Sequence, residues 1–240
     1  MTERNVPALE DGGAQPLYQQ LMNRILADIA SGKYPVDTQI PSERELGEWY
    51  QVSRVTVRRA LSELTQRGVL KKRQGKGTFV AAPKLMRDLR DVNSFHDVCQ
   101  MQGMTSSTQV ISVQIVKADA QTQADLQTES ERVVELTRLR LADNTPIMLE
   151  TNRFPLSYAA MMQEDLTQSL YALLEKNGVT PRRGIHEISL CYATAQQARL
   201  LAVEPGSALL LLREVVFDQH GLPLHTSHQV IRGDRFTFRI

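Results

Sequence analysis

Two helix-start signals, Ser42 and Ser53, stand close together in the first third of the chain. Ser42 is followed three residues later by Glu45, which is the spacing of a capping box. Ser53 opens a second segment, residues 54–67, and Gly68 provides a stop signal for it. Because only a short segment separates the two, the sequence predicts a pair of helices joined by a tight turn.

The segments on either side of this pair complete a recognisable unit. Residues 17–31 carry apolar side chains at every fourth position and predict an amphipathic helix. Residues 69–80 contain two short strand-like runs joined by the turn Gly75-Lys76-Gly77. We therefore expect a winged helix-turn-helix domain over residues 14–82, preceded by a loose polar tail.

The second helix of the pair has the chemistry of a DNA-recognition helix. Arg54 and Arg58 are four residues apart, so they project from one side, away from the apolar stripe. An arginine can bond guanine through two N–H groups or hold a phosphate, and Thr56 lies between the two. Lys76 places a cation on a thin glycine loop. A single arginine of this kind is more often part of a solvated helix face, but the combination favours DNA binding.

Charge and composition agree with this interpretation. The net charge is only +1, yet residues 17–82 hold 11 Lys and Arg against 6 Asp and Glu, so the positive field belongs to the predicted DNA-binding domain. The longest apolar runs, such as residues 208–212, are far too short for a membrane helix, and the chain opens with no apolar signal segment. We expect a cytoplasmic protein with no membrane partner. Cys99 and Cys191 stand far apart, which predicts reduced thiols and no cofactor.

The rest of the chain predicts an α+β domain. Residues 83–93 lack an apolar period and are interpreted as a linker, followed by a second domain over residues 94–240. Six strand-like runs are expected at 110–116, 133–141, 147–153, 185–193, 208–217 and 224–231. Helices are expected at 120–126, 166–177 and 194–202. Hairpin-type turns at 143–146 and 219–221 favour a mainly antiparallel sheet with helices packed against it.

One of these strands carries a candidate anion site. Arg138 and Arg140 alternate with apolar residues, so both guanidinium groups lie on one face, about 7 Å apart. A hairpin centred near Thr145 places Glu150 opposite Arg140. The arrangement predicts either an anion-binding pocket or an ordinary cross-strand salt bridge.

A metal site is the other chemistry that this domain suggests. His220, His225 and His228 lie close together in the sequence, but in a strand His225 and His228 face opposite sides, which disfavours a shared metal ion. We expect no metal and no catalytic residues.

The first domain resembles the GntR family of regulators. The resemblance rests on Pro41-Ser42-Glu43-Arg44-Glu45-Leu46, on Val52-Ser53-Arg54-Val55-Thr56-Val57-Arg58-Arg59-Ala60-Leu61 and on Gly75-Lys76-Gly77-Thr78-Phe79-Val80. The resemblance implies that Arg44, the recognition helix and the wing contact the operator. Arg59 and residues 71–73 are expected to attract DNA phosphates without sequence preference. The candidate DNA-binding residues are Arg44, Ser53, Arg54, Thr56, Arg58, Arg59, Gln74, Gly75, Lys76 and Gly77.

The second domain resembles the UTRA effector-binding domain of the HutC-type subgroup, which has a chorismate-lyase-like fold. The resembling residues are Arg138-Leu139-Arg140-Leu141-Ala142-Asp143, Pro146, Glu150, Ser169-Leu170-Tyr171, Glu187 and Arg232-Gly233-Asp234-Arg235-Phe236. The resemblance implies a homodimer that binds a phosphorylated or carboxylated metabolite through the two arginines and a helix start. The candidate effector-binding residues are Ser94, Phe95, His96, Arg138, Arg140, Glu150, Ser169, Tyr171 and His225. His225 and Ile231 depart from the Glu and Tyr that sugar-phosphate-binding relatives often carry.

Taken together, the sequence predicts a repressor that a small anionic metabolite, such as a phosphorylated sugar or sugar conjugate, releases from double-stranded operator DNA. A lyase-like activity of the second domain is the main alternative. A nonspecific architectural nucleic-acid-binding protein is a further one, which the ordered recognition helix disfavours.

Overall fold

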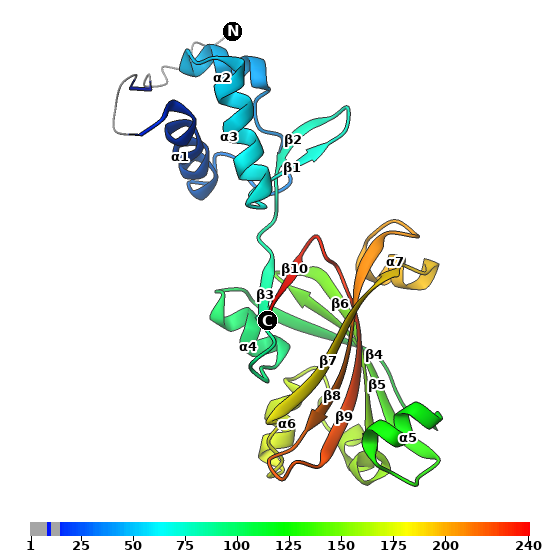
Figure 1. Ribbon diagram of the computed structural model, residues 1–240. Coiled ribbons are helices and arrows are strands. Elements are labelled where there is room, and N and C mark those ends of the chain that lie inside the picture. The colour runs from blue at the N-terminus through cyan, green and yellow to red at the C-terminus, as the bar shows by residue number, and fades with distance from the viewer. Residues whose placement is uncertain (1–8, 11–14) are drawn as a thin grey trace. The chain divides into compact units, whose positions relative to one another are not determined.

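The computed structural model describes residues 9–10 and 15–240, and it divides the chain into two compact units on either side of Pro83 and Lys84 (Figure 1). The expected start of the first domain, at residue 14, lies outside the described residues. Among the described residues, the helices are too short or too polar to cross a lipid bilayer.

The first unit has the predicted order of helices and strands. Helix α1 spans Leu17–Ala30, α2 spans Glu43–Tyr50 and α3 spans Arg54–Gln66. Ser42 and Glu45 form the complete capping box, and the Ser53 side chain accepts from the amide of Thr56, so both helix starts are confirmed. The apolar faces of the helices enclose one core, formed by Leu21, Met22, Ile25, Ile40, Leu46, Tyr50, Val57, Ala60, Leu61, Leu64, Leu70 and Val80.

An antiparallel hairpin follows α3. Strands β1 (Leu70–Arg73) and β2 (Gly77–Val80) pair along their whole length, so the predicted wing is confirmed. Gly77 has a φ of +115°, and a Cβ at this position would lie 2.5 Å from Nε2 of Gln39. The Gln39 side chain could move aside, but the positive φ itself favours glycine at this position, where β2 begins.

A six-stranded antiparallel sheet forms the centre of the second unit. Its order is β4-β5-β6-β9-β8-β7. All six predicted strands are confirmed, each within a few residues of its expected ends. They are β4 (Ser106–Lys117), β5 (Arg132–Ala142), β6 (Thr145–Pro155), β7 (Arg183–Tyr192), β8 (Ala208–Phe217) and β9 (Pro223–Ile231).

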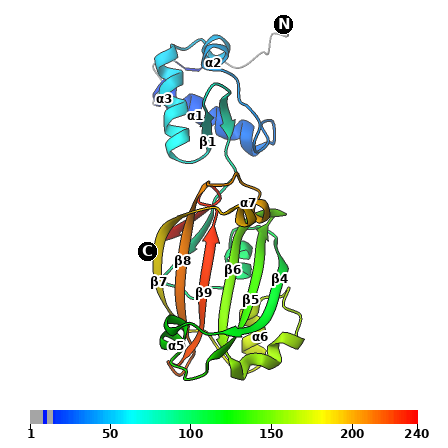
Figure 2. The ribbon, with the colours of Figure 1, turned by 90° about the vertical axis from the view of Figure 1, so that its right-hand side faces the viewer.

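Helices lie on both faces of this sheet. Helices α5 (Ala120–Leu126) and α7 (Ala195–Leu201) lie at opposite ends of one face (Figure 2). The other face is covered by α4 (Phe95–Met101), the 3-10 helix η1 (Leu156–Gln163) and α6 (Leu170–Lys176), which pack on apolar residues of the strands. Helix α6 begins four residues later than the predicted start at residue 166, because Ser169 caps it.

The expected linker over residues 83–93 is wrong in its central part. Residues Leu85–Asp88 form strand β3, which pairs in parallel with β10 (Phe236–Arg239). Leu85 is fully buried against Phe236 and the end of α4. The four-residue strand is too short to show an apolar period, and its partner lies at the other end of the chain. Residues 85–88 therefore belong to the second unit.

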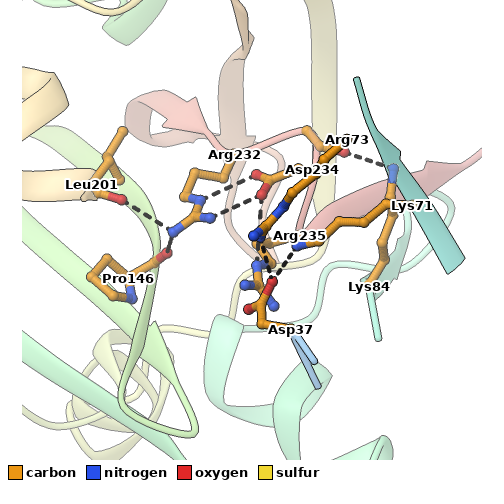
Figure 3. Close-up of polar contacts among 10 residues, drawn as sticks. Asp37, Lys71, Arg73, Lys84, Pro146, Leu201, Arg232, Asp234 and Arg235 are labelled. Carbon is orange, nitrogen blue, oxygen red and sulfur yellow. Dashed lines mark hydrogen bonds and ion pairs between the residues drawn. The ribbon is translucent and has the colours of Figure 1, made fainter. Parts of the chain in front are cut away.

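Arg232 fixes the connection that leads from β9 to β10. Its guanidinium group donates to Asp234 and to the backbone carbonyl oxygens of Leu201 and Pro146 (Figure 3). These contacts join the end of α7 and the start of β6 to the C-terminal segment. Arg232 is therefore a structural residue in the described chain.

Candidate DNA interface and effector pocket

The start of helix α3 presents the predicted recognition residues to the surface. Arg54 and Arg58 are exposed, whereas Val57 between them is fully buried. The hydroxyl groups of Ser53 and Thr56 lie 2.9 Å apart and are hydrogen-bonded. Ser53 thus caps the helix and orients Thr56 on the same surface.

Two of the predicted DNA contacts form ion pairs within the unit. Nε of Arg58 lies 3.1 Å from a carboxylate oxygen of Glu43, and Nη1 of Arg44 lies 3.0 Å from Glu48. Exposed pairs of this kind contribute at most about 1 kcal/mol. A DNA phosphate or guanine can therefore replace either carboxylate at little cost.

The residues at the tip of the wing are free of the side-chain contacts that hold the expected phosphate attractors, among the residues that the structure describes. Gln74, Gly75, Lys76 and Gly77 are all exposed, which suits an approach to the DNA backbone. The expected phosphate attractors are more constrained. Arg59 stacks over the ring of Tyr18 at 3.9 Å, and Lys71 and Arg73 both pair with Asp37.

Val55 is a surface residue that the sequence reasoning did not single out. It lies in the first turn of α3 and is 79% exposed, which is unusual for a β-branched apolar side chain. Apolar side chains contact the methyl group of thymine in the major groove. The signal was present in the sequence, because Val55 falls off the apolar stripe of its own helix.

The second unit has a pocket on the face of the sheet that α4 and α6 cover. It brings together seven of the nine predicted effector residues: Ser94, Phe95, Arg138, Arg140, Glu150, Tyr171 and His225. His96 and Ser169 lie outside it, in a neighbouring hollow that also reaches Arg140. Of the nine predicted effector residues, Arg140 borders both the pocket and the neighbouring hollow.

The predicted strand register, in which Glu150 lies directly opposite Arg140, is wrong. Glu150 lies opposite Arg138, and Met148 lies opposite Arg140. Two local features set this register. The turn of the hairpin is formed by Asp143 and Asn144, both with positive φ. A bulge between Arg140 and Leu141 then shifts the pairing by one residue. The turn thus precedes the predicted centre at Thr145, and this is why Glu150 faces Arg138 instead of Arg140.

The two arginines consequently differ in their partners, although each is only 2% exposed. Arg138 donates to Glu150 over 2.8 Å and to the backbone oxygen of Gln168 over 3.4 Å. Arg140 stays 4.0 Å from Glu150 and stacks on the ring of Phe95. Its Nε and Nη1 atoms are buried and have no hydrogen-bond partner among the described residues. Burial and the nearby Arg138 lower the pKa of Arg140 to about 10, so it remains a cation at neutral pH.

A second buried ion pair borders the same pocket, and the sequence reasoning missed it. Arg87 of β3 forms two hydrogen bonds with Glu214 of β8, over 2.8 and 3.3 Å, and Gln229 donates to the same carboxylate. Arg87 lies in the segment interpreted as a linker. Glu214 had a signal, because Arg213-Glu214 interrupts an otherwise apolar strand.

The contribution of this ion pair to the stability of the protein should depend on pH. Burial alone would raise the pKa of Glu214, but the charge and hydrogen bonds of Arg87, together with His186, whose Nδ1 lies 2.8 Å from the carboxylate, lower it from 4.5 to about 2. A carboxyl group whose pKa is lower in the folded state than in the unfolded state stabilises the fold at pH values above its unfolded-state pKa. This contribution is lost as the pH falls from about 4.5 through about 2.

We therefore expect the wild type to lose on the order of 3 kcal/mol more than the double variant Arg87→Met, Glu214→Gln over this pH range. Urea unfolding of both proteins at a series of pH values measures the difference. Parallel loss of stability in the two proteins would show that the pair does not titrate in this way.

His225 and Tyr171 line the middle of the pocket. His225 is buried, which lowers its pKa, and its Nδ1 lies 3.3 Å from the backbone oxygen of Thr226. This contact favours the tautomer with the proton on Nδ1, which leaves Nε2 as an acceptor without a partner among the described residues. His228 lies on the opposite, exposed face of β9, and Ile231 packs in the apolar core beside Met148.

The predicted helix start is present at α4, but its serine is occupied. The Ser94 hydroxyl donates to Asp97 over 2.6 Å and accepts from the amide of Asp97. Its own amide donates to the same carboxylate, which completes a capping box. The amides of Phe95 and His96 are the groups that a ligand at this turn would meet. The Ser169 hydroxyl similarly caps α6.

Comparisons with known proteins agree with both halves of the chain. A family model described as bacterial regulatory proteins, gntR family, matches residues 17–80, and a UTRA domain model matches residues 101–237. The chain is 33% identical to the transcriptional repressor NagR of Bacillus subtilis over 93% of each chain. It is 34% identical over 94% of each chain to a probable fructoselysine utilization operon repressor of Escherichia coli. The crystal structure of PhnF from Mycobacterium smegmatis has a TM-score of 0.71 and 28% identity, and the match covers 93% of this chain and 97% of that one.

Proposed function

The chain belongs to the GntR family of bacterial regulatory proteins, and from this premise we propose that it is a cytoplasmic repressor that an anionic metabolite releases from its operator. The exposed arginines of α3 enter the major groove, and the glycine wing approaches the DNA backbone. A homodimer places two such units on the half-sites of a pseudo-palindrome, because the symmetry of the protein requires the same symmetry in its site.

The buried guanidinium of Arg140 is the observation that supports an anionic effector. Three cations, Arg87, Arg138 and Arg140, border the pocket, against two carboxylates, Glu150 and Glu214. The excess positive charge falls on Arg140, which has no hydrogen-bond partner for Nε and Nη1 among the described residues. Burial of a charge without a partner is costly, whereas a phosphate or carboxylate that accepts from both atoms removes that cost.

The remainder of the pocket suits a polyhydroxy compound. His225 offers an acceptor, and Tyr171 and Glu150 add polar groups between apolar walls formed by Phe95 and Leu170. The name of one relative refers to fructoselysine, a sugar conjugate, which favours a phosphorylated sugar or sugar conjugate as the ligand class. We assign the pocket to sensing rather than catalysis, since the relatives named above are transcriptional regulators.

The experiment that tests this function has two readouts on the full-length protein. A thermal-shift screen in phosphate-free buffer compares phosphorylated sugars with the same sugars without phosphate. Each compound that raises the melting temperature is then tested for release of operator DNA selected from a random pool. A phosphorylated compound that does both supports the proposal. Stabilisation only by unphosphorylated compounds, or no selective DNA binding at all, would contradict it.

A further inference from the structure

Strand β3 is the part of the second unit that directly follows the DNA-binding unit. The boundary between the units lies at Pro83 and Lys84, and β3 begins at Leu85. Its backbone pairs with β10 in a two-stranded sheet that is separate from the six-stranded one. The position of β3 on the pocket therefore depends on side-chain contacts.

Arg87 supplies the strongest of these contacts. Successive residues of β3 alternate, so Met86 is 41% exposed while Arg87 is buried and borders the pocket. The two hydrogen bonds to Glu214 attach the strand to β8 of the large sheet. Nε of Arg87 is buried and has no hydrogen-bond partner among the described residues, so the guanidinium retains one donor for a ligand.

A second contact joins β3 to the wall of the pocket. The Gln102 side chain, at the C-terminal end of α4, accepts from the amide of Met86 over 2.9 Å and donates to its carbonyl oxygen over 2.8 Å. Helix α4 also carries Phe95, whose ring lies under Arg140. A ligand that binds against Arg140 and Phe95 therefore contacts helix α4, which is hydrogen-bonded to β3 through Gln102.

We propose that Arg87 is the positioning residue that couples the occupied pocket to strand β3, and through it to the DNA-binding unit. This rests on the proposed effector site at Arg138 and Arg140. The anion accepts a hydrogen bond from Nε of Arg87, while Glu214 keeps its contact with the Nη atoms. Ligand binding thus adds a contact to β3, fixes the strand more firmly on the pocket and restricts the segment at Pro83 and Lys84.

Hydrogen–deuterium exchange of the full-length protein tests this with inorganic phosphate as the probe. In the wild type, phosphate should slow exchange at α4 and β5, which line the pocket, and also slow it about tenfold at β3. The double variant Arg87→Met, Glu214→Gln removes both charges together, so that neither is left buried and unpaired. Because the variant also lacks the Arg87 contact with the anion, we expect it to need more phosphate. At saturating phosphate it should still show protection at α4 and β5, while exchange at β3 changes by less than about twofold.

The matched control is Arg153→Met, Glu135→Gln. This pair also joins an arginine to a glutamate, over 2.9 Å, but from the opposite face of the sheet. It should retain the wild-type response at β3. An equal β3 response in the Arg87 variant and the wild type overturns the coupling, as does wild-type protection of the pocket without any change at β3. Absence of phosphate protection at α4 and β5 in the wild type overturns the proposed anion site, and the coupling with it.

Discussion

Replacement of Arg140 by methionine is expected to leave the melting temperature unchanged or higher, and to remove the stabilisation of the protein by phosphorylated ligands. Arg140 is 2% exposed and is 4.0 Å from the nearest carboxylate oxygen of Glu150. A neutral side chain of similar length removes a buried charge whose Nε and Nη1 have no hydrogen-bond partner among the described residues. The loss of charge-assisted hydrogen bonds should weaken ligand affinity about 100-fold.

Arg138→Met is the matched comparison and should behave differently. Arg138 holds Glu150 over 2.8 Å, so its removal leaves a buried carboxylate without its closest counter-charge. We expect a loss of about 3–5 kcal/mol in the free energy of unfolding. The double variant Arg138→Met, Glu150→Gln should recover most of it. Thermal and urea unfolding with and without ligand measure all three proteins. If Arg140→Met is as destabilising as Arg138→Met, the two arginines serve an ordinary structural salt bridge rather than an anion site.

The elements that sequence reasoning predicted are those whose signals are local. Ser42 and Ser53 determine where α2 and α3 begin, because a capping hydroxyl and the amides it satisfies lie within one helical turn. The strands of the six-stranded sheet were found because each is long enough for alternation or a sustained apolar run to be visible. The pairing of Arg138 and Arg140 on one face follows from the same two-residue period.

What sequence reasoning missed depends on contacts between distant segments. Strand β3 has four residues, and its partner β10 lies about 150 residues further along the chain, so no local pattern marks either as a strand. Arg87 becomes part of the pocket only because this pairing brings it to Glu214. The partner of Glu150 was misassigned because the hairpin turn lies at Asp143 and Asn144 rather than at Thr145, and the bulge corrects only one residue of that difference.

On the DNA side, Arg58→Ala and Lys76→Ala are expected to weaken binding in different ways. Arg58 projects from α3 beside Arg54, where we propose that it contacts base edges, and its present partner Glu43 is a partly exposed carboxylate. Its loss should cost about 1–3 kcal/mol on the selected operator and much less on random DNA. Lys76 lies on the exposed wing between two glycines, where we propose a DNA phosphate as its partner. Its loss should weaken binding to both DNAs alike and reduce the salt dependence by about one counterion.

Competition binding of operator and random DNA across a salt series separates the two roles. Glu43→Gln is an informative companion, since it removes the carboxylate that competes for Arg58 and should raise operator affinity while leaving the helix cap at Ser42 in place. Lys72→Ala is the control for general charge, because Lys72 is exposed on β1, away from the tip of the wing. If Arg58→Ala and Lys76→Ala reduce operator and random binding by the same factors, then Arg58 acts on the phosphate backbone and sequence is recognised elsewhere on α3. Val55 is then the next residue to change, because it is the most exposed apolar side chain in the first turn of that helix.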